Sequence, residues 1–186
     1  TPVCSSAASD VYKRQTTQGA TEYTDKVGDG AGVFKSNDRG NSWTQINNGL
    51  DSLETNILTV DPNDSETLYL GTDDDGVYKS TDGGESWKKL TVSSLSKSFG
   101  VGDIIVDPQN SNNIYIGTVD YFRLSESRGV LGDFGVYKST DGGATWEEFN
   151  VGLNHLGVFS LELSEENRIL YAGTRAGGVY WISLDN

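Results

Sequence analysis

Short runs dominated by apolar residues, each followed by turn-forming residues, recur along the chain from residue 56 onward. Runs rich in Val, Ile, Leu and Tyr and bounded by Gly, Pro, Asn or Asp predict β-strands. A turn signal separates the two runs of a pair, Asp61-Pro62 in one case and Asp107-Pro108 in the next. Apolar residues at both odd and even positions are typical of sheets that are covered on both faces. The predicted strands cover residues 56–60, 67–71, 103–106, 114–118, 159–163 and 170–174.

A longer pattern with a polar centre is written out three times. Residues 32–43, 76–87 and 135–146 each begin with Gly-Val, an aromatic residue and Lys, and each ends on Trp. A fourth copy begins at residue 178. The first two of these tryptophans are 44 positions apart, and the third follows after 59. Self-similarity at such a period indicates a repeat architecture in which similar modules stack side by side.

The chemistry of one copy predicts a β-hairpin with a tight corner. Short Ser and Asp side chains accept hydrogen bonds from backbone N–H groups inside a turn, and Gly takes the positive φ that a sharp reversal needs. The Trp supplies a large apolar surface that can cover the hairpin. Because the same residue types return in every copy, we interpret them as structural rather than catalytic. They are Ser36, Asp38, Gly40, Trp43, Ser80, Asp82, Gly84, Trp87, Ser139, Asp141, Gly143 and Trp146.

These residues resemble the Asp-box repeat, also called the bacterial neuraminidase repeat, with the pattern Ser-x-Asp-x-Gly-x-Thr/Ser-Trp. The resemblance covers roughly residues 28–184. In that family the motif lies between the third and fourth strands of a β-propeller blade. We therefore expect an all-β fold, a β-propeller segment of four-stranded antiparallel blades. About three to four blades would form an incomplete ring, whose open sheet edges the remaining blades or a second chain would cover.

The repeat divides the chain into blades. The expected modules are a partial blade over residues 16–50, blades over 51–93 and 94–152, and a partial blade over 153–186. Residues 1–15 match no later part of the chain and resemble translated adapter sequence. We expect them to be a non-native or disordered segment.

One loop carries most of the difference between the modules. Between the second and third predicted strands, one module has residues 119–134 where its neighbour has only 73–75. In a four-stranded antiparallel blade this connection lies at the end opposite the Asp-boxes. Loops that vary on a constant scaffold often carry function, so we expect any ligand there.

The candidate ligand-binding residues at that end combine aromatic rings, arginines and a carboxylate. Such residues can stack on a sugar or hold an acidic group. The alternative interpretation is an exposed loop held by an ordinary ion pair. The candidates are Tyr121, Phe122, Arg123, Glu126, Arg128 and Arg175.

Charge and composition exclude several classes of function. The 186 residues carry a formal net charge of -13, which argues against nucleic acid or an anionic membrane as a partner. No apolar run approaches the length of a membrane span. Cys4 and His155 are the only residues of their kinds, so neither an intrachain disulfide nor a Cys/His zinc site is expected. The acidic triplet at residues 73–75 could help to bind calcium or be a solvated turn, and we predict neither a metal site nor a cofactor.

The resemblance implies two classes of function, because the family includes both enzymes and binding proteins. Its sialidases use an arginine triad, and its xyloglucanase-type enzymes need a pair of carboxylates. Its sortilin-type receptors and photosystem II assembly factors bind proteins. No motif here identifies a nucleophile, so we assign no catalytic residue. Our hypothesis is a non-catalytic binding or scaffold module of a larger secreted protein, extracellular or periplasmic, that recognises a glycan or a protein. The alternative is a fragment of a glycoside hydrolase, either sialidase-like or xyloglucanase-like.

Overall fold

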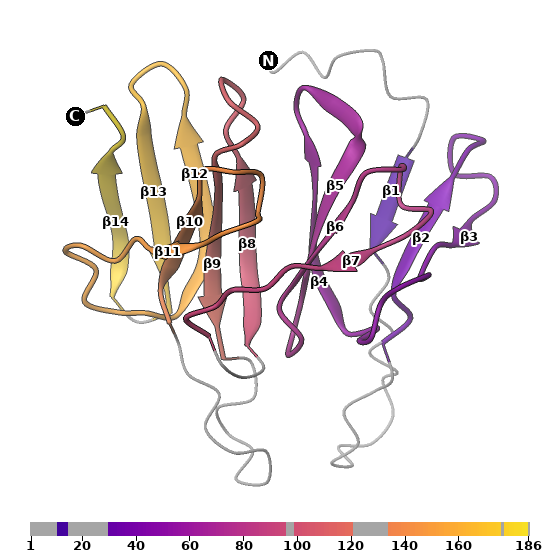
Figure 1. The fold of residues 1–186 in the computed structure, drawn as a ribbon, viewed down its shortest axis with the longest axis horizontal. Coiled ribbons are helices and arrows are strands. Elements are labelled where there is room, and N and C mark those ends of the chain that lie inside the picture. Colours follow the sequence, from indigo (N-terminus) through magenta and orange to yellow (C-terminus); the bar gives the residue numbers. More distant parts are fainter. Residues whose placement is uncertain (1–10, 15–29, 96–98, 121–133, 176, 186) are drawn as a thin grey trace, which may run out of the picture.

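Every regular element of the chain is a β-strand in the computed structural model, which describes residues 11–14, 30–95, 99–120, 134–175 and 177–185. The strands form four antiparallel sheets that stand side by side, as Figure 1 shows. We call these sheets blades 1 to 4 in chain order. Among the described residues, no helix is long and apolar enough to cross a membrane.

Each blade is built from strands that are consecutive in sequence and adjacent in the sheet. Blade 1 contains β1 (Val11–Arg14), β2 (Val33–Ser36) and β3 (Thr44–Gln45). Blade 2 contains β4 (Thr55–Asp61), β5 (Asp64–Thr72), β6 (Val77–Ser80) and β7 (Lys88–Lys89). Blade 3 contains β8 (Gly100–Val106), β9 (Ile114–Val119), β10 (Val136–Ser139) and β11 (Glu147–Glu148). Blade 4 contains β12 (Val158–Ser164), β13 (Ile169–Thr174) and β14 (Gly178–Ser183).

The six strands predicted from the apolar runs are confirmed as β4, β5, β8, β9, β12 and β13. The observed strands start earlier or end later than the apolar runs, because backbone pairing continues into the flanking residues. The structure also contains a strand that was not expected. Residues 11–14 form β1, which pairs with β2 and places Tyr12 opposite Lys35. That residues 1–15 are foreign to the natural chain stays a prediction.

Apolar clusters fill the spaces between successive blades. Leu68 and Leu70 of blade 2 pack with Val33 of blade 1. On the other face of blade 2, Tyr69 and Val77 belong to the cluster that blade 3 completes. A third cluster joins blade 3 to blade 4. Blades 2 and 3 are therefore covered on both faces, as their apolar runs predicted.

Glycines on the first two strands of a blade let the first strand of the next blade approach closely. A Cβ on Gly71 would lie 2.7 Å from the side chain of Val101, and one on Gly117 would lie 2.7 Å from Val158. A Cβ on Gly102 would lie only 2.2 Å from the carbonyl oxygen of Val158. Gly102 also lies where the register of β8 shifts against β9. A bulge at this position therefore brings β8 against β12 and sets the spacing of the blades.

Candidate functional site

The blades have two different ends. At the box end lie the hairpin turns β4–β5, β8–β9 and β12–β13 and the corners that join third to fourth strands (Figure 1). At the loop end lie the connections β5–β6, β9–β10 and β13–β14 and the linkers between blades. The sequence pattern predicted this division.

The corner of blade 2 is closed by its own side chains. The Ser80 hydroxyl accepts the N–H of Gly84 at 2.9 Å and donates to Asp82 at 2.7 Å. Asp82 accepts the Ser86 N–H at 2.9 Å and the Ser86 hydroxyl at 2.5 Å. Both oxygens of the carboxylate are therefore used within the turn. The same bonds recur through Ser36, Asp38, Gly40 and Ser42 in blade 1 and through Ser139, Asp141, Gly143 and Thr145 in blade 3.

These hydrogen bonds hold the corner carboxylates in the ionised form. The hydroxyl and amide of Ser86 and the hydroxyl of Ser80 lower the pKa of Asp82 from 3.8 to about 2. The equivalent bonds lower the pKa of Asp38 and of Asp141 to about 2 as well. A carboxylate with such a low pKa is a poor general acid near neutral pH, which fits a role in the turn.

The corner tryptophans lie against the preceding blade. Trp87 is only 5% exposed, and its indole N–H donates to the carbonyl of Ile46 at 2.8 Å. Trp146 packs at the interface of blades 2 and 3 together with Leu90. The indoles of Trp87 and Trp146 thus join the corners of blades 2 and 3 to the end of the preceding blade.

A threonine clamp repeats at the loop end. The Thr72 hydroxyl donates to the Gly76 carbonyl at 3.0 Å and accepts the Asp75 N–H at 2.8 Å. Thr118 and Thr174 make the equivalent bonds at the ends of β9 and β13. In blade 3 this clamp closes the base of the long insertion. The second–third connection can therefore change length without changing the strands that carry it.

A tyrosine on the third strand contacts the incoming linker in three blades, but its partners differ. The Tyr78 hydroxyl accepts the N–H of Asp51 at 3.2 Å. Burial raises the pKa of the Tyr137 hydroxyl, and the neighbouring side chains of Ser94 and Glu148 shift it further, in opposite directions. Tyr180 lies 3.0 Å from a ring nitrogen of His155.

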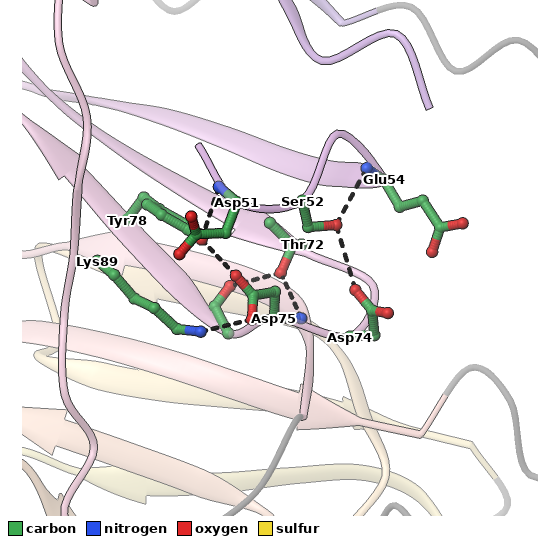
Figure 2. Close-up of polar contacts among 9 residues, drawn as sticks. Asp51, Ser52, Glu54, Thr72, Asp74, Asp75, Tyr78 and Lys89 are labelled. Carbon is green, nitrogen blue, oxygen red and sulfur yellow. Dashed lines mark hydrogen bonds and ion pairs between the residues drawn. The ribbon is translucent and has the colours of Figure 1, made fainter. Parts of the chain in front are cut away.

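In blade 2, Asp74 and Asp75 of the acidic triplet take part in the polar contacts that Figure 2 shows. Tyr78 donates to Asp75, whose carboxylate also accepts from Lys89 at 2.5 Å. Burial and the bond to Asp75 raise the pKa of the Tyr78 hydroxyl, so it stays protonated and donates. Asp74 accepts from the Ser52 hydroxyl at 3.2 Å. Among the described residues, no group of three or more His, Cys, Asp or Glu side chains is placed to hold a metal ion.

Arg175, the one candidate ligand residue that the structure describes, lies between blades 3 and 4 at the loop end. Its guanidinium donates to the carbonyl of Asp120 at 2.5 Å and lies 5.1 Å from the ring centre of Phe159. Phe159 stands at the bulge of β12 and is 40% exposed. Asp120 is the second residue of the 119–134 connection, so the start of that connection lies beside this cation–aromatic pair. The other candidates, Tyr121, Phe122, Arg123, Glu126 and Arg128, lie outside the described residues.

Sequence reasoning missed Phe159 and the two repeated loop-end features. The threonine clamp had a signal, because Gly71-Thr72, Gly117-Thr118 and Gly173-Thr174 share one dipeptide. The tyrosine also repeats, after Gly-Val. Phe159 had no such signal, because its partner Arg175 is distant in sequence.

The blades and their repeated corners define a segment of an Asp-box β-propeller. A sequence model described as Sortilin-Vps10 (sortilin, neurotensin receptor 3) matches residues 31–180. The chain belongs to this family of propellers.

Individual relatives include enzymes that act on glycans. The chain is 36% identical over 96 residues to a xyloglucanase, Xgh74A of Acetivibrio thermocellus, an alignment that covers 47% of the chain and 11% of the relative. The crystal structure of a GH74 enzyme from Niastella koreensis is 27% identical, with a TM-score of 0.58, and the match covers 82% of the chain and 24% of that protein. An ancestral GH74 enzyme has a TM-score of 0.63 at 24% identity, with 83% and 20% covered. The chain thus spans about a tenth of the length of the curated xyloglucanase.

Proposed function

We propose that this chain is the glycan-binding part of a larger secreted glycoside hydrolase related to xyloglucanases, and that it contacts a neutral β-glucan at the loop end. The observation that carries the proposal is the pair formed by Phe159 and Arg175 at the base of the insertion. A half-exposed ring with an adjacent guanidinium offers an apolar face for a sugar and donors for its hydroxyls. The alignment with a xyloglucanase favours a polymer of this class as the ligand.

The charge of the chain favours a neutral polymer. With 27 acidic and 14 basic residues, the chain repels a polyanion such as a pectin or a sialylated glycan. A neutral glucan needs stacking and hydrogen bonds rather than a basic surface. This reasoning separates the xyloglucanase-like interpretation from the sialidase-like one.

The corner aspartates and Asp75 have partners within this segment, which favours binding rather than bond cleavage by it. Hydrolysis needs two carboxyl groups that face one glycosidic bond across roughly 5–9.5 Å. The corner aspartates are used within their own turns, and Asp75 is shared by Lys89 and Tyr78. We therefore assign cleavage to the remaining part of the parent protein. A protein ligand is the second candidate, because the matching family model is that of a receptor.

Affinity electrophoresis and calorimetry with soluble xyloglucan test the proposal. We expect binding to xyloglucan, weaker binding to polygalacturonate and no release of reducing sugar. Phe159→Ala should weaken binding roughly tenfold, the ratio that ~1.4 kcal/mol of stacking gives. Thr81→Ala, at an exposed position of the box end, is the matched control and should bind as the parent does. Absent binding, or equal binding by both variants, would contradict the proposal.

A further inference from the structure

The outer strands of blades 2 and 3 carry opposite charges at the same two positions of the repeat. β7 consists of Lys88 and Lys89, and β11 consists of Glu147 and Glu148. All four residues are exposed. Blade 2 therefore presents a basic edge to solvent, and blade 3 presents an acidic edge. We call these four residues the rim.

The two edges lie at the same side of the molecule. β7 and β11 each form one end of a four-stranded sheet, and β4 and β8 form the other ends. Because β4 packs against β8, the two outer strands lie on the side away from that contact. Among the described residues, no strand pairs with the outer side of β7 or of β11. Both edges belong to blades that have all four strands, so their exposure follows from the blade itself.

Apolar side chains lie between the two charged edges. Trp146 directly precedes β11 and is half-buried, and Leu90 directly follows β7. Both pack on the apolar cluster that blades 2 and 3 share. The indole N–H of Trp146 donates to the carbonyl of Gly143 in its own corner at 3.1 Å. An aromatic anchor surrounded by polar residues is typical of protein interfaces.

Charge complementarity selects one partner and one orientation. Two basic edges repel each other, and so do two acidic edges. A two-fold axis that runs between blades 2 and 3, parallel to their outer strands, places β7 of each copy against β11 of the other. Both contacts are then identical and favourable, so the assembly closes as a dimer. The surface thus fits a second copy of this chain.

The overall charge opposes any contact that lacks this match. Each copy carries a formal net charge of -13, and at physiological ionic strength their mutual repulsion is largely screened beyond ~8 Å. Opposite charges in direct contact lie within that distance. Because exposed ion pairs each contribute little, the dimer is expected to be weak.

We propose that the rim is a self-association surface, through which two copies of the chain form a weak two-fold dimer. Lys88 and Lys89 of each copy face Glu147 and Glu148 of the other. The contact does not use the loop end, so it is independent of the proposed glycan site.

Sedimentation velocity of the full chain over a range of concentrations tests the proposal. We expect a monomer–dimer equilibrium with a Kd below ~100 µM at about 0.15 M ionic strength. A chain that stays monomeric at several times that concentration would overturn the proposal.

Two double variants exchange the charges of the rim. Lys88→Glu with Lys89→Glu makes both edges acidic, and Glu147→Lys with Glu148→Lys makes both edges basic. Each variant alone should dimerise at least tenfold more weakly than the parent. An equimolar mixture should associate as tightly as the parent, because every acidic edge again meets a basic one. Parent-like dimerisation of either variant alone, or a mixture that stays monomeric, would contradict the assignment of the rim.

Glu165→Lys with Glu166→Lys is the matched control. It adds the same charge as the basic-rim variant, at exposed positions in the turn between β12 and β13. We expect it to dimerise at least as tightly as the parent. A loss equal to that of the basic-rim variant would assign the effect to net charge and overturn the proposal.

The basic-rim variant is compatible with the fold. Glu147 lies opposite Lys138, and the equivalent position in blade 2 already places Lys88 opposite Lys79. Far-UV circular dichroism confirms that each variant is folded. Recovery of the dimer in the mixture provides a second check, because unfolded chains would not restore it.

Discussion

The two ends of the blades are built on different principles. At the box end, the bond from the corner glycine N–H to the serine hydroxyl is 2.7, 2.9 and 2.9 Å in blades 1, 2 and 3. At the loop end, the equivalent tyrosines Tyr78, Tyr137 and Tyr180 contact an aspartate, a serine with a glutamate, and a histidine. The corner is constant because all its partners lie within a few residues. The loop end joins segments distant in sequence, so its partners can change from blade to blade while the threonine clamp keeps the strands fixed.

The largest expected effect is at the box end, where Trp87→Ala removes a buried indole between blades 1 and 2. It should lower the free energy of unfolding by roughly 3–5 kcal/mol, through lost burial and the cavity that remains. Urea denaturation measures the change. Trp43→Ala is the matched control, because Trp43 is only half-buried and should cost clearly less. Equal losses for the two variants would remove the distinction between a buried and a peripheral corner tryptophan.

The second effect concerns an ion pair across the blade 3–blade 4 interface. Arg168 donates to both oxygens of Asp107, at 2.9 and 2.6 Å, and the Asp107 side chain is 0% exposed. Burial by itself would raise the pKa of Asp107, but the bonds from Arg168, Gln109 and Asn113 lower it below its usual value. Arg168→Ala leaves this carboxylate without its counter-ion and should cost about 3 kcal/mol of stability in urea denaturation.

Arg39→Ala is the control for Arg168→Ala. Both arginines have positive φ, 59° for Arg39 and 48° for Arg168, so the backbone contribution of the substitution is similar. Arg39 is exposed. If both variants lose the same stability, the ion pair contributes nothing beyond backbone strain.

A smaller loss of stability is expected at acidic pH. The pKa of the corner aspartates falls on folding from 3.8 to about 2, so the folded state prefers the ionised form. The resulting stability is present above pH ~4 and is lost as the pH falls through ~2. The urea midpoint should therefore drop over this range, and Asp82→Asn should make the drop shallower. A midpoint that is independent of pH below ~4 would contradict the assigned hydrogen bonds.

The smallest effect is expected at the loop end. Lys89 bonds to Asp75 at the surface, with side chains 46% and 22% exposed. Lys89→Met should change the free energy of unfolding by less than ~1 kcal/mol, because water screens an exposed pair and ordering its long side chain costs entropy. A loss as large as that of Arg168→Ala would show that both ends carry stability equally.

Local chemistry explains what the sequence could predict. The corner of Ser80 and Asp82 and the apolar strands were predictable, because their partners lie within one repeat. Arg175 was placed at the correct end, since the alternation of hairpins determines that end. Its contacts with Asp120 and Phe159 were not predictable, because they depend on how blade 4 meets blade 3.

Register and spacing between blades were also beyond the sequence pattern. The close approach of Gly102 to Val158 and the pairing of Arg168 with Asp107 arise only when two blades meet. No apolar period in the sequence predicts the strand at residues 11–14, which pairs with β2. Arg14 pairs with Val33 in blade 1. At the equivalent position, Gly71 pairs with Val77 in blade 2 and Gly117 pairs with Val136 in blade 3. Blade 1 therefore differs from the others at this position.

The division between a constant end and a binding end can be measured directly by two-dimensional NMR during titration with a xyloglucan oligosaccharide. The account predicts amide shifts that cluster at the loop end, at Phe159, Arg175 and Asp120, with the corner amides of Gly84 and Gly143 unchanged. Shifts at those corner glycines, with the loop end unaffected, would contradict it.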